Sequence, residues 1–261
     1  MTPKLLVLGG GRMGEALLAG LLEAGWAGAA ELAVSEPDEA RRRALAEAHP
    51  GLSVVAGPVE APDVVLAVKP DVAEAALRAL PDPRRVLSIV AGLGAARLEA
   101  ALPDTCVVVR AMPNTPALVG AGVAGMSGGT TATSADLDWA EGILGAVGTV
   151  VRLPERHLDA VTGISGSGPA YLFLVAEALV EAGVTAGLSR DVSHQLVVGT
   201  FVGAARMLDE TADDPAALRA AVTSPGGTTA AALRTLESKA VRSAFIEAVA
   251  AATERSRQLG R

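Results

Sequence analysis

The sequence predicts an α/β protein in which a doubly wound, mostly parallel sheet is followed by an all-α C-terminal part. Up to about residue 154, short apolar runs that end at Gly or Pro alternate with stretches of helical periodicity. From about residue 155 onward, only helical periodicity remains. The join between the two parts is short, so we expect two domains, at residues 1–154 and 155–261.

Strands are expected in the first domain where apolar runs are too short for helices. These runs cover residues 4–10, 32–37, 52–55, 63–70, 85–92, 105–113 and 148–154. Helices are expected between most of them, at residues 12–25, 38–48, 71–80, 95–102 and 135–147. Strand, helix and strand in short succession predict parallel pairing, with helices on both faces of the sheet.

The first two helices have the clearest end signals. Met13, Leu17 and Leu21 fall on one face of the first helix, and Gly25 ends its pattern. Asp38 precedes the second helix and is of a residue type that caps helix N-termini.

The helices of the second domain are apolar over more than one face. They are expected at residues 169–187, 190–210, 214–222, 227–238 and 240–260, and residues 165–169 have the pattern of a helix start. A helix that is apolar most of the way round must be buried, and so few helices could hardly bury one another completely. We expect a homodimer or higher homo-oligomer formed through these helices; the alternative is a compact monomeric bundle.

Composition excludes several classes of function. The formal net charge is −7, and no basic cluster is longer than Arg41–Arg43, so a nucleic-acid partner is not expected. The one cysteine, Cys106, lies in an apolar run and is expected to be buried and inert. The three histidines are isolated, so no metal site is expected. We see neither a signal peptide nor a membrane span, and we expect a cytoplasmic protein.

A glycine-rich loop follows the first expected strand and opens the first expected helix. Its sequence fits G-x-G-x-x-G, in the context that a dinucleotide site requires. The first glycine allows a tight turn, the second lets the backbone approach a pyrophosphate, and the third lets the helix pack on the strand. The helix N-terminus would then hold the phosphate charge. The resulting cofactor-binding candidates of a Rossmann-type domain are Gly9, Gly11, Arg12, Met13 and Gly14.

Ser35 and Glu36 end the second expected strand, about 20 residues beyond the glycine-rich loop, where an acidic side chain accepts hydrogen bonds from the adenosine ribose. A carboxylate repels a 2′-phosphate, so Glu36 favours NADH over NADPH. Ser35 and Arg41 could still accommodate a phosphate, and both cofactors remain open. Glu36 could also be an ordinary exposed side chain beside Pro37.

Three further expected strands, at residues 63–70, 85–92 and 105–113, end in turn-forming residues. Ligands of open parallel sheets bind at these carboxyl ends, so the three ends should form one crevice. Each taken alone could be an ordinary turn. The cofactor-binding candidates that they add are Ala67, Val68, Lys69, Pro70, Ala91, Gly92 and Asn114.

Four stretches together resemble the pyrroline-5-carboxylate reductase family, whose members reduce a cyclic imine to proline. They are AVKP from Ala67, RAMPNTPALVGAG from Arg110, DAVTGISGSGPAYLFLVAEAL from Asp159 and VTSPGGTTAAALRTLE from Val222. The resemblance runs from the glycine-rich loop almost to the last residue. It implies NAD(P)H as cofactor, a C-terminal dimerisation domain, and pyrroline-5-carboxylate and proline as small-molecule ligands. Many family members have small polar residues where Glu36 stands, which suits NADPH and leaves the cofactor choice open.

The resemblance also implies that the neutral loop SPGGTT binds the substrate. Its substrate-binding candidates are Ser224, Gly226, Gly227, Thr228 and Thr229. Backbone N–H groups at a helix start can bind a carboxylate without any lysine or arginine. Catalysis would then rest mostly on positioning, with the Thr229 hydroxyl hydrogen-bonding the ring nitrogen, as a donor or as a relay to water. A plain capped helix is the alternative interpretation of this loop.

Two rival functions make different demands on the sequence. A β-hydroxyacid dehydrogenase-like enzyme would need a lysine on the first long C-terminal helix, but the only lysines are Lys4, Lys69 and Lys239. A nucleotide sensor on the same scaffold would not need the second anion site in SPGGTT. Both rivals are therefore less favoured than the reductase.

Overall fold

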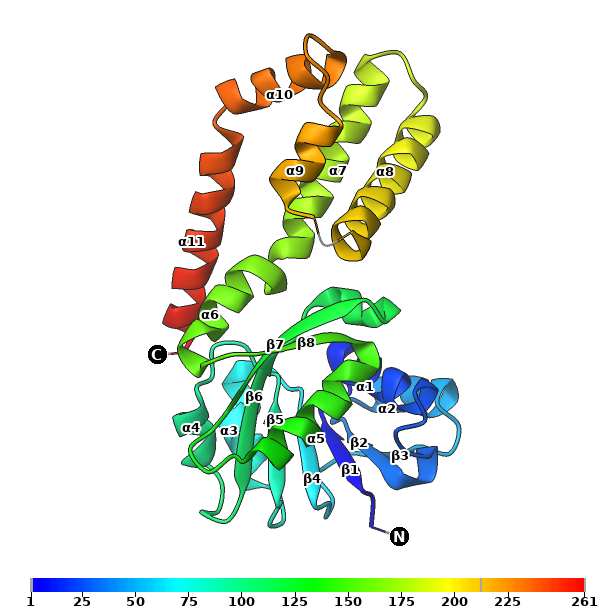
Figure 1. Ribbon diagram of the computed structural model, residues 1–261. Helices are drawn as coiled ribbons and strands as arrows, with labels where there is room; N and C mark the ends of the chain where they lie inside the picture. The colour runs from blue at the N-terminus through cyan, green and yellow to red at the C-terminus, as the bar shows by residue number, and fades with distance from the viewer. Residues whose placement is uncertain (1, 212, 261) are drawn as a thin grey trace. The chain divides into compact units, whose positions relative to one another are not determined.

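The computed structural model describes residues 2–211 and 213–260, and it divides into two compact units (Figure 1). The first unit comprises Met1–Pro169 together with Val249–Arg261, and the second comprises Ala170–Ala248. The domain boundary that the sequence predicts, between residues 154 and 155, stays a prediction. In the folded chain the compact first unit extends to Pro169 and includes the last part of the final helix.

The first unit contains a sheet flanked by helices. Its strands are β1 (Leu5–Leu8), β2 (Leu32–Ser35), β3 (Ser53–Val55), β4 (Asp63–Leu66), β5 (Arg85–Ser88), β6 (Val107–Met112), β7 (Gly122–Gly128) and β8 (Gly148–Arg152). Its helices are α1 (Arg12–Glu23), α2 (Glu39–Ala48), α3 (Pro70–Arg78), α4 (Ala95–Glu99), α5 (Ser134–Leu144) and α6 (Leu158–Val161). Short 3₁₀ segments η1 (Ala29–Glu31), η2 (Thr115–Val119), η3 (Gly145–Val147) and η4 (Glu155–His157) connect them.

The strand order is β3-β2-β1-β4-β5-β6-β7-β8, and every pair is parallel except β6 with β7. β1 is paired with β2 on one side and β4 on the other, with Val7 opposite Val34 and Val65. The chain order therefore reverses between β1 and β4. In open parallel sheets, such a switch point leaves a crevice at the carboxyl ends of the strands.

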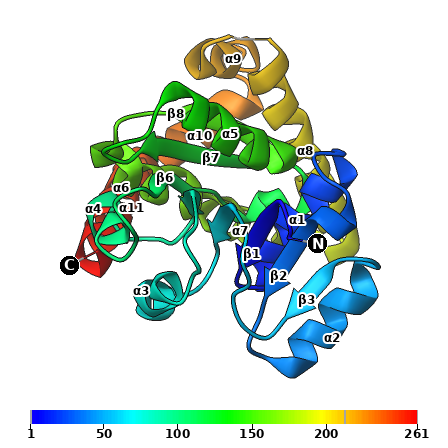
Figure 2. The ribbon, with the colours of Figure 1, turned by 90° about the horizontal axis from the view of Figure 1, so that it is seen from below.

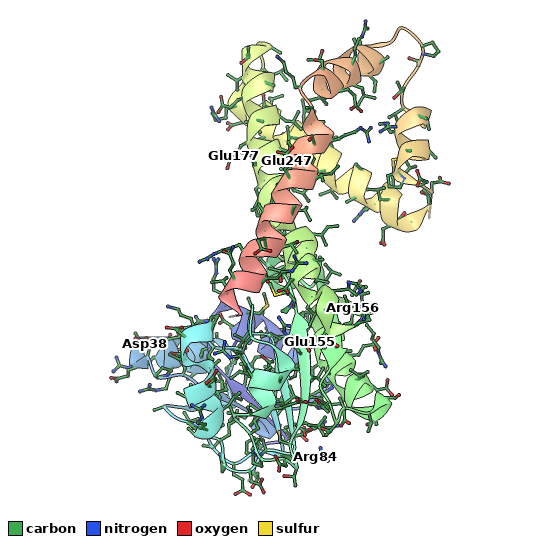
Figure 3. All side chains as sticks on the ribbon, turned by 90° about the vertical axis from the view of Figure 1, so that its left-hand side faces the viewer. Asp38, Arg84, Glu155, Arg156, Glu177 and Glu247 are labelled. Carbon is green, nitrogen blue, oxygen red and sulfur yellow. The ribbon has the colours of Figure 1, made fainter. Side chains whose placement is uncertain are left out.

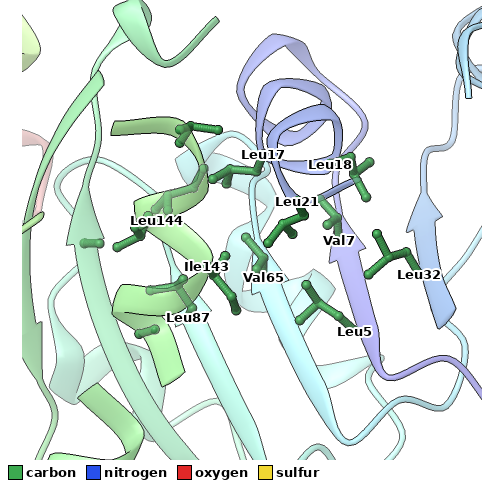
Figure 4. Packing of buried hydrophobic residues seen from close by; sticks show 14 of the residues in the cluster. Leu5, Val7, Leu17, Leu18, Leu21, Leu32, Val65, Leu87, Ile143 and Leu144 are labelled. Carbon is green, nitrogen blue, oxygen red and sulfur yellow. The ribbon is translucent and has the colours of Figure 1, made fainter. Parts of the chain in front are cut away.

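Helices cover both faces of this sheet, because alternate residues of each buried strand point to opposite sides. Leu5 and Val7 pack with the apolar side chains of α1 and α5, among them Leu17 and Ile143 (Figure 4). On the other face, Leu6 packs with the apolar side chains of α3 and α4. Figure 2 shows α3 and the pair α1 and α2 around the strands from below. The expected doubly wound, mostly parallel sheet is confirmed.

The sequence analysis missed strand β7. Its residues, Gly122–Gly128, include three glycines, a composition that is typical of turns rather than strands. Two of these glycines are needed for packing. A Cβ at Gly122 would lie 2.9 Å from Ala117 Cβ, and one at Gly125 would lie 2.8 Å from Val161 Cγ2. β7 runs antiparallel to β6, so it is the one departure from an all-parallel sheet among the described pairs.

Helical structure at the domain junction begins before the helix start expected at residues 165–169. α7 (Gly168–Thr185) starts within the expected segment, but α6 and a π-helical turn, η5 (Thr162–Gly166), precede it without a loop. Glu155–Thr185 is the one stretch within the described residues whose length and composition would suit a membrane span.

The second unit contains α7 from Ala170, α8 (Arg190–Glu210), α9 (Pro215–Ala221), α10 (Thr228–Ser238) and the start of α11 (Val241–Leu259). All five helices were expected. Of residues 170–211 and 213–248, only Val180 and Ser193 are buried. Large apolar side chains are exposed instead, among them Phe173 at 63 % and Ile246 at 70 %. This unit exposes more apolar surface than an isolated subunit normally does.

Candidate functional site

The glycine-rich loop has the backbone geometry that its sequence predicts. Gly9 has φ +109°, and a Cβ there would lie 2.6 Å from Ala67 O. A Cβ at Gly14 would lie 2.1 Å from Gly9 O, so α1 packs directly against the loop. A Cβ at Gly11 would meet nothing within 4 Å, which leaves open space beside the start of α1. A ligand can therefore approach the backbone at Gly11.

Glu36 lies against this loop and is not free in solvent. Its carboxylate accepts hydrogen bonds from Gly10 N (3.0 Å) and from Asp38 N (3.0 Å). Arg41 donates to Gly10 O (2.7 Å) and to Glu15 (2.5 Å). The acidic group thus stands at the carboxyl end of β2, while the guanidinium of Arg41 is already paired.

The N-termini of the helices differ in how they are capped. Side chains of Asp38, Ser189 and Asp214 accept hydrogen bonds from the first turns of α2, α8 and α9. The caps of α1, α3 and α10 are Gly11, Lys69 and Gly227, and none of these supplies a side-chain cap. An uncapped N-terminus leaves backbone N–H groups and the positive end of the helix dipole available to an anion. Two of the three follow β1 and β4, on either side of the switch point.

A cleft of about 270 Å³ lies at the carboxyl ends of β4, β5 and β6. Its lining residues are Met13, Ala67, Val68, Ile89, Met112, Pro113, Asn114, Thr115 and Gly166. The expectation that three strand ends form one crevice is confirmed. Of the cofactor-binding candidates, Met13, Ala67, Val68 and Asn114 line the cleft itself.

The other cofactor-binding candidates lie beside this cleft in the fold. Gly9, Gly11, Arg12 and Gly14 form the turn into α1, Ser35 and Glu36 end β2, and Lys69 and Pro70 start α3. Ala91 and Gly92 follow β5. All of them lie at the carboxyl end of a parallel strand or in the loop or helix start that follows it.

The Asn114 side chain joins two elements around the cleft. Its Nδ2 donates to Ser165 O in the π-helical turn (3.0 Å), and its Oδ1 accepts from Val123 N in β7 (2.9 Å). Asn114 is only 7 % exposed, so both polar atoms of its amide are used internally. The hydrogen bonds indicate that Asn114 shapes the cleft wall; whether it also contacts the cofactor stays a prediction.

Glu155, labelled in Figure 3, makes a second connection between distant segments, which the sequence did not reveal. Its Oε1 accepts from Ala95 N (2.7 Å) and from Arg110 Nη1 (3.1 Å). Ala95 is the first residue of α4, and Arg110 lies in β6, 45 residues before Glu155. No local pattern marks such a contact, because it depends on strand pairing far away in the sequence.

The second unit contains the SPGGTT loop, which forms the turn into α10. Gly226 has φ +71°, a value that favours glycine, and Gly227 is the extended N-cap residue. A Cβ at Gly227 would lie 2.3 Å from Ser224 Oγ, so a side chain there would force the Ser224 hydroxyl to move. Thr228 and Thr229 are the first two residues of α10, and their N–H groups have no side-chain cap. The five substrate-binding candidates are thus brought together at one helix start.

The thiol and the possible metal ligands can be assessed for the residues that the structure describes. Burial raises the pKa of the Cys106 thiol to about 12, so the thiol stays protonated near neutral pH. Among the residues that the structure describes, no group of three or more His, Cys, Asp or Glu side chains could hold a metal ion. The cleft of the first unit has mainly apolar walls, and the SPGGTT loop of the second unit offers backbone N–H groups and hydroxyls.

Comparisons with known proteins match two families to different parts of the chain. Residues 155–259 match the family model for pyrroline-5-carboxylate reductase dimerisation, and residues 4–92 match that for the NADP oxidoreductase, coenzyme F420-dependent family. The chain is 43 % identical to the pyrroline-5-carboxylate reductase of Synechocystis sp., over 100 % of both chains. It is 45 % identical to that of Mycobacterium tuberculosis, over 98 % of this chain and 96 % of the relative.

Solved structures of similar proteins cover the whole chain. One is a pyrroline-5-carboxylate reductase from Coxiella burnetii, with a TM-score of 0.91, 34 % identity and coverage of 100 % of both chains. Another is the Plasmodium falciparum pyrroline carboxylate reductase with NADP bound, with a TM-score of 0.88 and 32 % identity. It covers 99 % of this chain and 98 % of that one.

Proposed function

The chain belongs to the pyrroline-5-carboxylate reductase family. We propose that its uncapped helix N-termini bind the cofactor and the substrate. The enzyme is an NAD(P)H-dependent oxidoreductase that reduces the C=N bond of 1-pyrroline-5-carboxylate to give proline. In our proposal, the N-termini of α1 and α3 bind the dinucleotide, and that of α10 binds the substrate carboxylate. Residues 1–154 act as the dinucleotide-binding domain, and residues 155–261 act as the substrate and dimerisation domain.

The observation that carries this proposal is the glycine cap of α10. Gly227 supplies no side-chain hydrogen bond, so the N–H groups of Thr228 and Thr229 remain available to a ligand. A substrate carboxylate in that place would receive charge-assisted hydrogen bonds and the favourable end of the helix dipole. Ser224 Oγ, which lies close to Gly227, is placed to add a hydroxyl donor.

The residues of the first unit suit a dinucleotide. The open space at Gly11 and the bare N-terminus of α1 fit a pyrophosphate, and the apolar cleft beside Met13 and Val68 fits a nicotinamide ring. NAD(P)H, when bound, supplies the hydride. The chain's own task is to hold the cofactor and keep water away from the reacting face.

We propose that NADH is preferred over NADPH. Glu36 presents a carboxylate at the end of β2, where it can accept hydrogen bonds from a ribose and would repel a 2′-phosphate. Arg41 is engaged with Gly10 O and Glu15, and Arg42 donates to the backbone oxygens of Glu36 and Pro37. An additional phosphate would have to displace these contacts.

Thr229 is the proposed catalytic residue. A protonated imine accepts hydride most readily, and a cyclic imine is basic enough to be protonated near neutral pH. The site therefore needs no strong acid, only a group that orients the ring nitrogen. The Thr229 hydroxyl, one residue inside α10, can hydrogen-bond that nitrogen directly or through water.

The chain self-associates, as the match to a dimerisation family indicates. We propose that the C-terminal helices form that interface, because their apolar side chains are exposed in the single chain. The same association would account for the apolar character of Glu155–Thr185 without a membrane. We further propose a cytoplasmic enzyme with no nucleic-acid partner, in keeping with its net charge of −7.

The test is oxidation of NADH and of NADPH, measured in parallel with pyrroline-5-carboxylate. We expect rapid turnover, with a higher kcat/KM for NADH. A folded protein that binds the nucleotide but turns over neither cofactor would favour a sensor or another imine substrate. Turnover with a clear preference for NADPH would refute the role proposed for Glu36.

A further inference from the structure

The end of α11 packs against the loop that follows β5. A Cβ at Gly92 would lie 3.1 Å from Leu259 Cβ and 3.2 Å from Gly260 N, and Gly92 has φ +77°. A Cβ at Gly260 would lie 2.2 Å from Gly92 O. The two backbones therefore touch: a side chain at Gly260 would overlap Gly92 O, and one at Gly92 would be tightly packed and strained by the positive φ. Gly92 and Gly260 are both within the first compact unit.

Side-chain contacts hold this part of α11 in place. Ser256 is 3 % exposed, and its Oγ donates to Asp159 Oδ1 in α6 (2.7 Å). One turn earlier, Thr253 lies so close to the π-helical turn that a Cβ at Gly163 would be 2.5 Å from Thr253 Oγ1. The segment that meets Gly92 is thus the end of an anchored helix.

Arg97 connects the same contact to α3, the helix that follows β4. Its Nη1 donates to Gly260 O (3.3 Å), and its Nη2 donates to Glu74 Oε1 (2.6 Å). Hydrogen bonding and charge from Arg97 lower the pKa of Glu74, so that carboxylate is ionised near neutral pH. Glu74 lies in α3, which begins at Pro70 directly after the cleft residues Ala67 and Val68.

We propose that Leu259 and Gly260, with Arg97, are positioning residues that hold the loop Ile89–Gly94 in its cofactor-binding conformation. Ile89 lines the cleft, and Ala91 and Gly92 are candidate cofactor contacts, so a shift of this loop changes the wall that the dinucleotide meets. None of the three touches the reacting atoms; they act through Gly92 and α3. The inference rests on the proposed dinucleotide site.

The test is direct binding of NADH, followed by its fluorescence, to the wild type and to Gly260→Ala. The added methyl group cannot fit against Gly92 O, so the loop must move. We expect Kd for NADH to rise about tenfold, KM for NADH to rise in parallel, and kcat at saturating NADH to change less than about twofold. Gly145→Ala is the matched control, because a Cβ there meets nothing within 4 Å.

Two further variants separate positioning from a steric clash or a folding defect. A variant that ends at Leu259 has no clash but also no contact with Gly92 O or Arg97, and we expect it to bind NADH weakly as well. Arg97→Gln should weaken binding, and Arg97→Lys should restore part of it. These two variants carry the test if Gly260→Ala does not fold.

The outcomes distinguish this inference from the proposed function. If the wild type does not bind NADH or NADPH, the dinucleotide site itself is wrong. If the wild type binds and the Leu259-terminated and Arg97→Gln variants bind equally well, the positioning role is wrong. A lower melting temperature with unchanged Kd would also overturn it, because that is the result of a merely structural contact.

Discussion

At the scale of single residues, the proposed reaction depends on groups that carry no charge. Thr229 and the backbone N–H groups beside it lie at the start of α10, and the cleft at the sheet is lined mainly by apolar side chains. Charged side chains near the cofactor site, such as Glu36 and Arg41, bind the glycine-rich loop itself. In the proposed mechanism, catalysis relies on orientation, so the substitutions that test it should change hydrogen bonds while preserving shape.

Thr229→Val replaces the hydroxyl with a methyl group of similar shape. We predict that kcat falls about 10- to 100-fold, the range expected when a hydrogen bond to a charged group is lost. Because the carboxylate site is retained, binding of the product proline should change little. Steady-state kinetics and proline binding measure the two effects, and Thr229→Ser should recover most of kcat. Full activity in Thr229→Val would exclude the proposed role.

Glu36→Ser removes the carboxylate that would repel a 2′-phosphate. We predict that the ratio of kcat/KM for NADPH to that for NADH rises at least about tenfold, a change of about 1.4 kcal/mol in transition-state stabilisation. Part of this change should come from a lower kcat/KM for NADH, because the hydrogen bonds to the ribose disappear and Gly10 N loses its acceptor. An unchanged ratio would mean that the preference is set elsewhere.

At the scale of helices and strands, the amino edge of the sheet is stabilised by a buried ion-pair cluster. Asp63 starts β4, its side chain is 4 % exposed, and it accepts from Arg84 (3.0 Å) and from Arg85 (2.7 Å). The Arg85 side chain is also largely buried, at 16 % exposed, and stacks on Trp139. This cluster lies at the opposite ends of the strands from the cleft, so it should govern stability without affecting catalysis.

Asp63→Asn removes the nearer of the two carboxylates beside Arg85 and leaves only Asp136, whose Oδ1 lies 3.8 Å from Arg85 Nη1. We predict a loss of about 3 kcal/mol in the free energy of unfolding, with kcat/KM nearly unchanged at a temperature where the variant is folded. Urea denaturation measures the loss. Arg84→Gln is the control, because Arg84 is 62 % exposed and its pair should contribute less than about 1 kcal/mol. Equal losses in the free energy of unfolding in both variants would contradict the expectation that the buried pair contributes more than the exposed one.

Local signals predicted most of these elements, and long-range contacts account for what was missed. The glycine-rich loop, the cap at Asp38 and the helix 190–210 can be read from neighbouring residues. β7 could not, because Gly122 and Gly125 are explained by Ala117 and Val161, which pack against them in the folded chain. The bond between Arg97 and Gly260 joins residues 163 positions apart, and no sequence window contains both.

At the scale of the whole molecule, the second unit is incomplete as a single chain. Almost all of its described side chains are at least partly exposed, and several large apolar ones are more than half exposed, among them Leu172 and Phe173. Burial of such surface is the main driving force of association. The dimerisation match at residues 155–259 covers these helices.

Phe173→Glu puts a charge in this apolar surface. We predict a shift from dimer or higher oligomer towards monomer, seen by light scattering after size-exclusion chromatography, together with a loss of most activity. Thr131→Glu places the same charge on an exposed loop of the first unit and should change neither property. A Phe173→Glu protein that keeps the wild-type mass would show that the association surface is elsewhere.

The most direct test of the account is whether the bare N-terminus of α10 binds the substrate carboxylate. Thr228→Pro removes one N–H donor at the first helical position, where proline is tolerated and Gly227 already has extended backbone. We predict that KM for pyrroline-5-carboxylate rises about 10- to 100-fold, while turnover of 1-pyrroline, which lacks the carboxylate, is unchanged. Thr228→Ala, which retains the N–H group, should behave like the wild type. Equal effects on both substrates, or no effect on either, would contradict the assignment of this helix terminus to the carboxylate.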